Sequence, residues 1–112
     1  MQPSEILTEQ DIHNAVDFLT NSAVGYATAK ANRARAEHML KVIKAVGMKN
    51  CGVSGVGAQE REALACNEYK SQIDAIFNFT VTEETLRAQI SAAIQKVEVW
   101  RTQSANLRGT RL

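Results

Sequence analysis

The stretch that decides the fold is Gly47–Gly57, GMKNCGVSGVG. It contains four of the six glycines in this chain of 112 residues. A glycine inside a helix costs about 1 kcal/mol relative to alanine, and glycine tolerates the backbone angles that turns require. We therefore predict that this segment is a loop at which the chain reverses direction.

The residues before this loop are predicted to form one long helix, from Thr8 to about Val46. Thr8 is a favourable N-cap, and Asp11 stands three positions later, as in a capping box. The helix carries apolar residues on two nearly opposite sides: Ile12, Ala15, Val16, Leu19, Ala23 and Tyr26 on one, and Ala36, Met39, Leu40, Ile43 and Val46 on the other. Either the helix kinks near residues 25–32, or its halves pack on different partners. A third reading is an alanine-rich middle that packs closely on a neighbouring helix.

A second helix is predicted from about Ala58 to a C-cap near Gly109. Its β-branched and aromatic stretch at residues 77–82 weakens helix formation. Either the helix continues there with a bend, or a short break at 78–82 produces a third helix. Apolar residues recur at helical spacing on both sides of this stretch: Cys66, Tyr69, Ile73 and Ile76 before it, and Leu86, Ile90, Ala93, Val97 and Trp100 after it.

These segments predict an all-α fold, an elongated antiparallel helical hairpin. One proline in the chain and the abundance of Ala, Glu, Lys, Gln and Arg agree with this class. The expected organisation is a flexible tail at 1–7, a single helical domain at 8–109 and a tail at 110–112. A lone two-helix hairpin buries little apolar surface, so we expect the chain to form a homo-oligomer.

The charges are segregated along the chain. Residues 28–51 contain six basic residues and one acid, a balance of +5, whereas the first twenty residues contain four acids and no base. On a helix, the residues of one basic stripe fall within about 80° of one another: Lys30, Arg33, Lys41 and Lys44. Such a stripe suits a polyanion, and Tyr26 lies on the same side as a candidate for stacking on bases. The alternative is a solvated helix face supported by a Glu37–Lys41 pair.

Other kinds of site find little support in the sequence. His13 and His38 stand far apart, and Cys51 and Cys66 lack metal-binding spacing, so we expect no metal site, no cofactor and no enzymatic activity. Both cysteines are expected to be free thiols. The chain has neither an apolar run long enough to span a membrane nor a secretory signal, so we expect an intracellular protein.

Three short motifs resemble a family of small phage proteins. They are Glu60-Arg61-Glu62-Ala63 followed by Tyr69, then Trp100-Arg101, then Ala105-Asn106-Leu107-Arg108. The layout is more distantly similar to the UvsY recombination mediators, which are helical oligomers that bind single-stranded DNA and help to load a recombinase. This chain departs from the phage pattern at Phe77–Thr82, where that family is plainly helical.

The resemblance implies an accessory protein of DNA recombination or replication in a phage or prophage. It would act in the cytoplasm of a bacterium or of a phage-infected host cell. The basic stripe would bind single-stranded DNA, and a recombinase would be a protein partner. The alternative function is a coiled-coil structural or assembly protein without a nucleic-acid role.

Overall fold

The computed structural model describes residues 6–110, with nothing said of the side chain at 110. Three helices occupy most of this range: α1 (Glu9–Asn50), α2 (Val56–Ala65) and α3 (Asn67–Thr110), and the described residues contain no strand. The prediction of an all-α helical hairpin is confirmed. Of the predicted tails, residues 1–5 and 111–112 lie outside the described residues.

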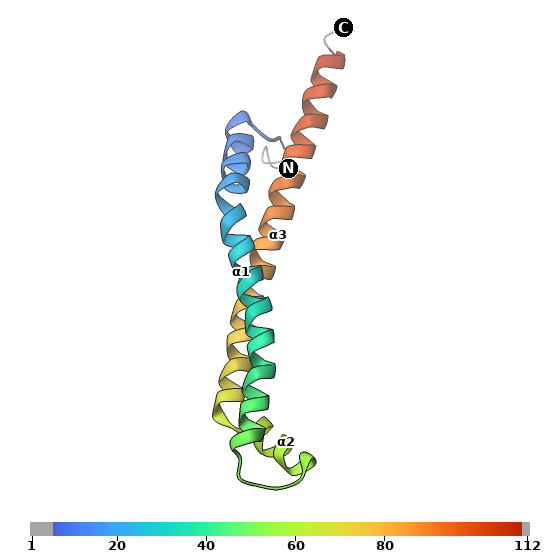
Figure 1. Ribbon diagram of the computed structural model, residues 1–112. Coiled ribbons are helices and arrows are strands. Elements are labelled where there is room, and N and C mark those ends of the chain that lie inside the picture. The colour runs from blue at the N-terminus through green and yellow to red at the C-terminus, as the bar shows by residue number, and fades with distance from the viewer. Residues whose placement is uncertain (1–5, 111–112) are drawn as a thin grey trace. The chain divides into compact units, whose positions relative to one another are not determined.

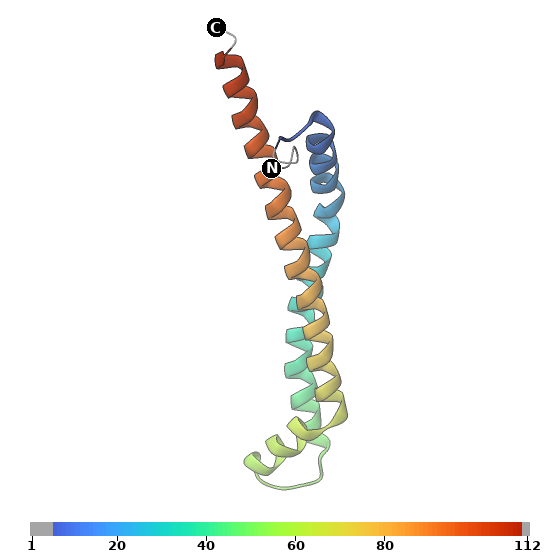
Figure 2. The same cartoon turned by 180° about the vertical axis from the view of Figure 1, so that it is seen from behind.

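The chain divides into two compact units, each containing part of both long helices. The terminal unit comprises residues 1–26 and 84–112, and the loop unit comprises residues 27–83. In each unit, a part of α1 runs antiparallel beside a part of α3 (Figures 1 and 2). The loop unit also contains α2 and the loop that precedes it.

The predicted capping box at the start of α1 is confirmed. The backbone N–H of Asp11 donates to the Thr8 hydroxyl at 3.1 Å, and the Thr8 N–H donates to the Asp11 carboxylate at 2.9 Å. Hydrogen bonding from Thr8 to the carboxylate, first from its backbone N–H and then from its side chain, holds the pKa of Asp11 below its ordinary value. The pairing satisfies two donors that a helix start would otherwise leave open.

Most of the partly or fully buried positions of α1 and α3 recur at alternating spacings of three and four residues. This is the spacing of a coiled-coil seam, with a period of 3.5 residues. On α1 the seam residues are Ile12, Ala15, Leu19, Ser22, Tyr26, Ala29, Arg33, Ala36, Leu40, Ile43 and Gly47. On α3 they are Tyr69, Gln72, Ile76, Phe79, Glu83, Leu86, Ile90, Ala93, Val97, Trp100 and Ser104.

This repeat corrects the interpretation of α1 as a helix with two opposed apolar sides. Val16, Met39 and Val46, which suggested those sides, are exposed. The seam repeat includes residues from both predicted apolar sides of α1. Because its members Ser22 and Arg33 are polar, a pattern of apolar residues alone does not reveal it. A 3.5-residue repeat drifts by about 20° per heptad on a straight helix, so over several heptads it resembles two stripes.

The helix boundaries around the loop also differ from the prediction. α1 extends to Asn50, and α2 begins at Val56. Loop glycines Gly52 and Gly55 have φ angles of 76° and 94°, which side-chain-bearing residues rarely adopt.

The second break in the helices lies at Cys66, between α2 and α3, and α3 is continuous through residues 78–82. There the hydroxyls of Thr80 and Thr82 donate to the carbonyls of Ile76 and Asn78, at 2.7 and 3.2 Å. Bonds to the carbonyl four residues back keep these threonines compatible with the helix.

Candidate nucleic-acid interface

The helix pair of the loop unit presents two flanks on either side of its seam. One flank carries a groove of about 180 Å³, and its lining combines α1 and α3: Asn32, Arg35, Ala36, Met39, Gln72, Ala75 and Phe79. At about 100° per residue, the predicted basic stripe projects to the other side of the α1 seam from Arg35 and Met39. On α3, Ile73 and Phe77 likewise project to the other side from Ala75. We call this second surface the basic flank: Lys30, Arg33, Lys41 and Lys44 of α1, with Ile73 and Phe77 of α3.

Arg33 does not face solvent freely, contrary to expectation. Its Nε donates a very short hydrogen bond to Oε1 of Glu83, and its Nη2 lies 3.4 Å from Oε2 of the same carboxylate. Glu83 is only 1% exposed, the most deeply buried polar residue among those described. The bonds to Glu83, and then to Glu37, raise the pKa of Arg33. Its positive charge is therefore balanced within the loop unit.

Glu37 also pairs differently from the prediction. Its carboxylate accepts a hydrogen bond from Nη1 of Arg33 at 2.9 Å, four residues earlier. The predicted partner Lys41, also four residues away, is exposed. Arg33 thus bridges a buried carboxylate on α3 and an exposed one on α1.

Lys44 is the second member of the stripe with an acidic partner. Its Nζ lies 2.9 Å from Oε1 of Glu60, and this ion pair joins α1 to α2. Lys30 and Lys41 are exposed, and no ion pair within residues 6–110 engages either of them. These two lysines are the cations of the basic flank that remain available to a phosphate.

Phe77 is the residue of this surface that the sequence analysis did not select. It is 66% exposed, and Ile73, one helical turn before it, is 47% exposed. Ile73 belongs to the predicted apolar stripe of the second helix, and Phe77 begins the stretch predicted to weaken that helix. The seam spacing identifies Ile73 and Phe77 as exposed residues, because positions 73 and 77 fall between the seam positions 69, 72, 76 and 79.

Tyr26, the predicted stacking residue, occupies a seam position of the terminal unit and is half-buried. The structure therefore gives it a packing role within that unit. Its predicted contact with bases remains a prediction.

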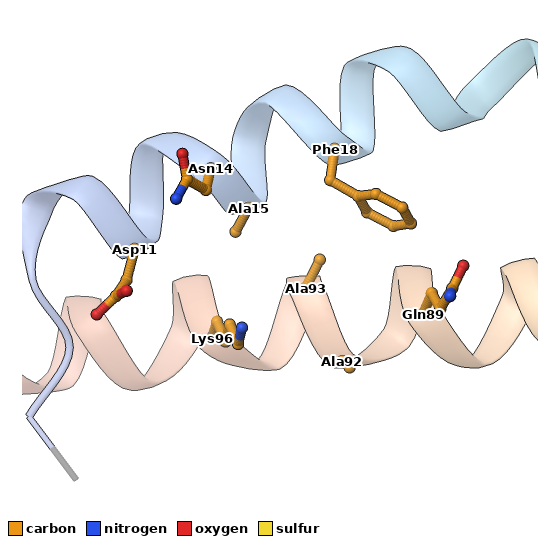
Figure 3. Close-up of a pocket in the computed structure, with 8 residues that line it drawn as sticks. All are labelled: Asp11, Asn14, Ala15, Phe18, Gln89, Ala92, Ala93 and Lys96. Carbon is orange, nitrogen blue, oxygen red and sulfur yellow. The ribbon is translucent and has the colours of Figure 1, made fainter. Parts of the chain in front are cut away.

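The terminal unit contains a pocket of about 300 Å³ between its two helices. Figure 3 shows Ala15 and Ala93 facing each other across the helix pair, with Phe18 beside them and Asp11 and Lys96 toward one end. Two alanines opposite each other leave the space that larger seam residues would fill. The carboxylate of Asp11 is already bonded to Thr8, and the lining offers no nucleophile with an adjacent base.

Residues with metal-binding or redox chemistry are dispersed in the described range. Within residues 6–110, no three His, Cys, Asp or Glu side chains gather as a metal site would require. Cys51 and Cys66 are free and half-buried, and the Cys51 thiol donates to the carbonyl of Met48 at 3.1 Å. No helix in the described range is long and apolar enough to cross a membrane.

The motifs that resemble the phage proteins have identifiable structural roles here. On α2, Glu60 pairs with Lys44, and Ala63 is buried where it meets Gly47 of α1. Arg101, in the second motif, pairs with Glu98 one turn earlier on α3. No protein-family model, curated protein or solved structure matches the chain, so these motifs alone carry the resemblance.

Proposed function

We propose that the protein binds single-stranded DNA on the basic flank of its loop unit. The observation that carries the proposal is the exposed ring of Phe77 on the same side of the helix pair as Lys30 and Lys41. Non-specific single-strand binding combines an aromatic platform for the bases with cations for the backbone. Each stacked base contributes about 1–3 kcal/mol in such sites.

The lysines supply the electrostatic part of this binding. An unpaired lysine that contacts a phosphate releases condensed counterions, and this release favours binding at low salt. Arg33 and Lys44, whose charges are balanced by Glu83 and Glu60, hold the helices together instead. The lysines that we propose to contact DNA are therefore Lys30 and Lys41. Phe77 lies between them along the length of the α1–α3 helix pair.

In this proposal the protein is an accessory factor of phage or prophage DNA recombination or replication. It acts as a homo-oligomer in the cytoplasm of the bacterial host, and it presents single-stranded DNA to a recombinase. The resemblance of its motifs to small phage proteins supports this setting, and the exposed apolar side chains of both long helices support self-association.

Fluorescence anisotropy with a labelled oligothymidine tests the DNA-binding proposal. The wild-type protein should bind at low salt, and Phe77→Ala should weaken binding by the loss of one stacked base. Val99→Ala is the matched control, because Val99 is also exposed on α3 but belongs to the terminal unit and not to the basic flank. Equal affinities of the Phe77 and Val99 variants would remove Phe77 from the site.

A coiled-coil structural or assembly protein is the second candidate. It is favoured by the seam repeat of α1 and α3 and by the neutralisation of two stripe cations by internal acids. Absence of binding to oligothymidine at low salt, together with an oligomeric mass in light scattering, would select this second function.

A further inference from the structure

Glu37 is an exposed acid inside the basic flank of the loop unit. It stands seven residues after Lys30 and four before Lys41, so at about 100° per residue it projects to the same side of α1 as both lysines. Its side chain is 52% exposed, and its carboxylate lies 2.9 Å from Nη1 of Arg33. A DNA backbone that reaches from Lys30 to Lys41 would therefore pass this carboxylate.

The guanidinium of Arg33 has two sides that are held differently. Nε and Nη2 face the carboxylate of Glu83, which is buried, so this side is fixed inside the helix pair. Nη1 lies against the exposed Glu37 instead, and the Arg33 side chain is 26% exposed. A guanidinium that is already held in place loses little conformational freedom when it binds a phosphate.

The charges at this level of the flank oppose a phosphate. Arg33 carries one positive charge, and Glu37 and Glu83 carry one negative charge each, so the three residues together have a net charge of −1. Carboxylate and phosphate oxygens both accept charge-assisted hydrogen bonds from a guanidinium. The Glu37 carboxylate thus occupies the place on Nη1 that a phosphate oxygen would take.

We infer that Arg33 is a third phosphate-binding residue of the basic flank, and that the Glu37 carboxylate competes with DNA phosphate for its Nη1. This inference rests on the proposed function and deepens it: Lys30 and Lys41 attract the strand, and Glu37 limits how tightly the flank holds it. Arg33 keeps its structural role in both states, because Nε and Nη2 stay on Glu83.

Fluorescence anisotropy with labelled oligothymidine at several salt concentrations tests the competition. Glu37→Gln removes the negative charge and leaves a neutral amide oxygen, which a phosphate displaces more easily than a carboxylate. The variant should bind about two- to fivefold more tightly than the wild type at low salt. Its log–log salt dependence should be steeper by about 0.7, the contribution of one further phosphate. A salt slope equal to that of the wild type would overturn the inference.

Two control variants separate this competition from a change in net charge. Glu62→Gln removes the same charge from an exposed position of α2 in the loop unit. Glu98→Gln frees Arg101 from a similar exposed pair in the terminal unit. Neither variant should change the salt slope. A change in either control as large as that in Glu37→Gln would show that net charge alone matters, and would overturn the inference.

The part of Arg33 is tested in a background without the nearest lysine. Lys41 stands one turn after Glu37, so Glu37 could also act by repelling phosphate from Lys41. In Lys41→Gln, the added Glu37→Gln substitution should still steepen the slope by about 0.7, because Arg33 supplies the contact. Loss of the steepening in this background would assign the effect to Lys41 and overturn the role of Arg33.

Failure of this inference is distinguishable from failure of the proposed function. If the wild type and Glu37→Gln bind oligothymidine with equal affinity and slope, the competition is overturned and DNA binding stands. If neither protein binds at low salt, both the proposed function and the inference are overturned. Binding by Glu37→Gln alone would support the competition and show that Glu37 closes the flank in the wild type.

Discussion

Arg33 of α1 holds the buried carboxylate of Glu83 on α3, fifty residues away in the sequence. Both residues occupy seam positions, where apolar side chains are expected. A buried ion pair usually adds little net stability over an apolar pair, but removing one partner is costly because the other stays buried. Polar residues at seam positions are also known to fix the register of helix pairs.

Single substitutions at this pair should therefore destabilise the protein. Arg33→Ala and Glu83→Ala should each lower the urea midpoint of unfolding, measured by circular dichroism. Glu37→Ala is the matched control: it removes only the exposed partner of Arg33, so its effect should stay within about 0.5 kcal/mol. The double variant Arg33→Leu/Glu83→Leu should regain most of the lost stability. A double variant less stable than both single alanine variants would show that the pair is needed for more than mutual neutralisation.

Two helical glycines should respond in opposite ways to alanine. A Cβ at Gly25 would lie 3.9 Å from Leu86 Cδ1, an ordinary contact, so Gly25→Ala should stabilise the protein by about 1 kcal/mol. A Cβ at Gly47 would lie 3.1 Å from the Cβ of Ala63 and 3.3 Å from its Cα, so steric repulsion should cancel that gain. Thermal unfolding measures both. An equal rise in the two melting temperatures would contradict the close packing of α2 on α1.

The capping box should make the start of α1 sensitive to acid. Because hydrogen bonds from Thr8 lower the pKa of Asp11 in the folded state, the ionised carboxylate stabilises the helix. This contribution is complete above the ordinary pKa of 3.8 and is lost as the pH falls through the lower folded value. The protection of amides in the first turn, taken relative to the intrinsic exchange rate at each pH, should fall over that window in the wild type and vary less in Asp11→Asn. At neutral pH, Thr8→Ala should cost about 1 kcal/mol.

The parts of the fold that depend on local chemistry follow from the sequence. The glycines of the loop and the Thr8–Asp11 box act over a few residues, and both were located correctly. The seam was missed because Ser22, Arg33 and Glu83 interrupt its apolar pattern, whereas exposed valines suggested other faces.

The basic flank was predictable only in part for a similar reason. Lys30 and Lys41 are exposed as expected. The acids that neutralise Arg33 and Lys44 are fifty and sixteen residues away, and helical periodicity within one segment does not reveal partners on another helix.

The salt dependence of DNA binding tests the central claim most directly. The logarithm of the binding constant for oligothymidine should fall linearly with the logarithm of salt concentration, with a slope of about −0.7 per phosphate neutralised. Lys30→Gln/Lys41→Gln should flatten that slope by about 1.4 units, because it removes two phosphate contacts. Lys96→Gln/Arg108→Gln, which removes the same charge from the terminal unit, should leave the slope unchanged. No binding by the wild type at low salt, or equal slopes for the two double variants, would contradict the account.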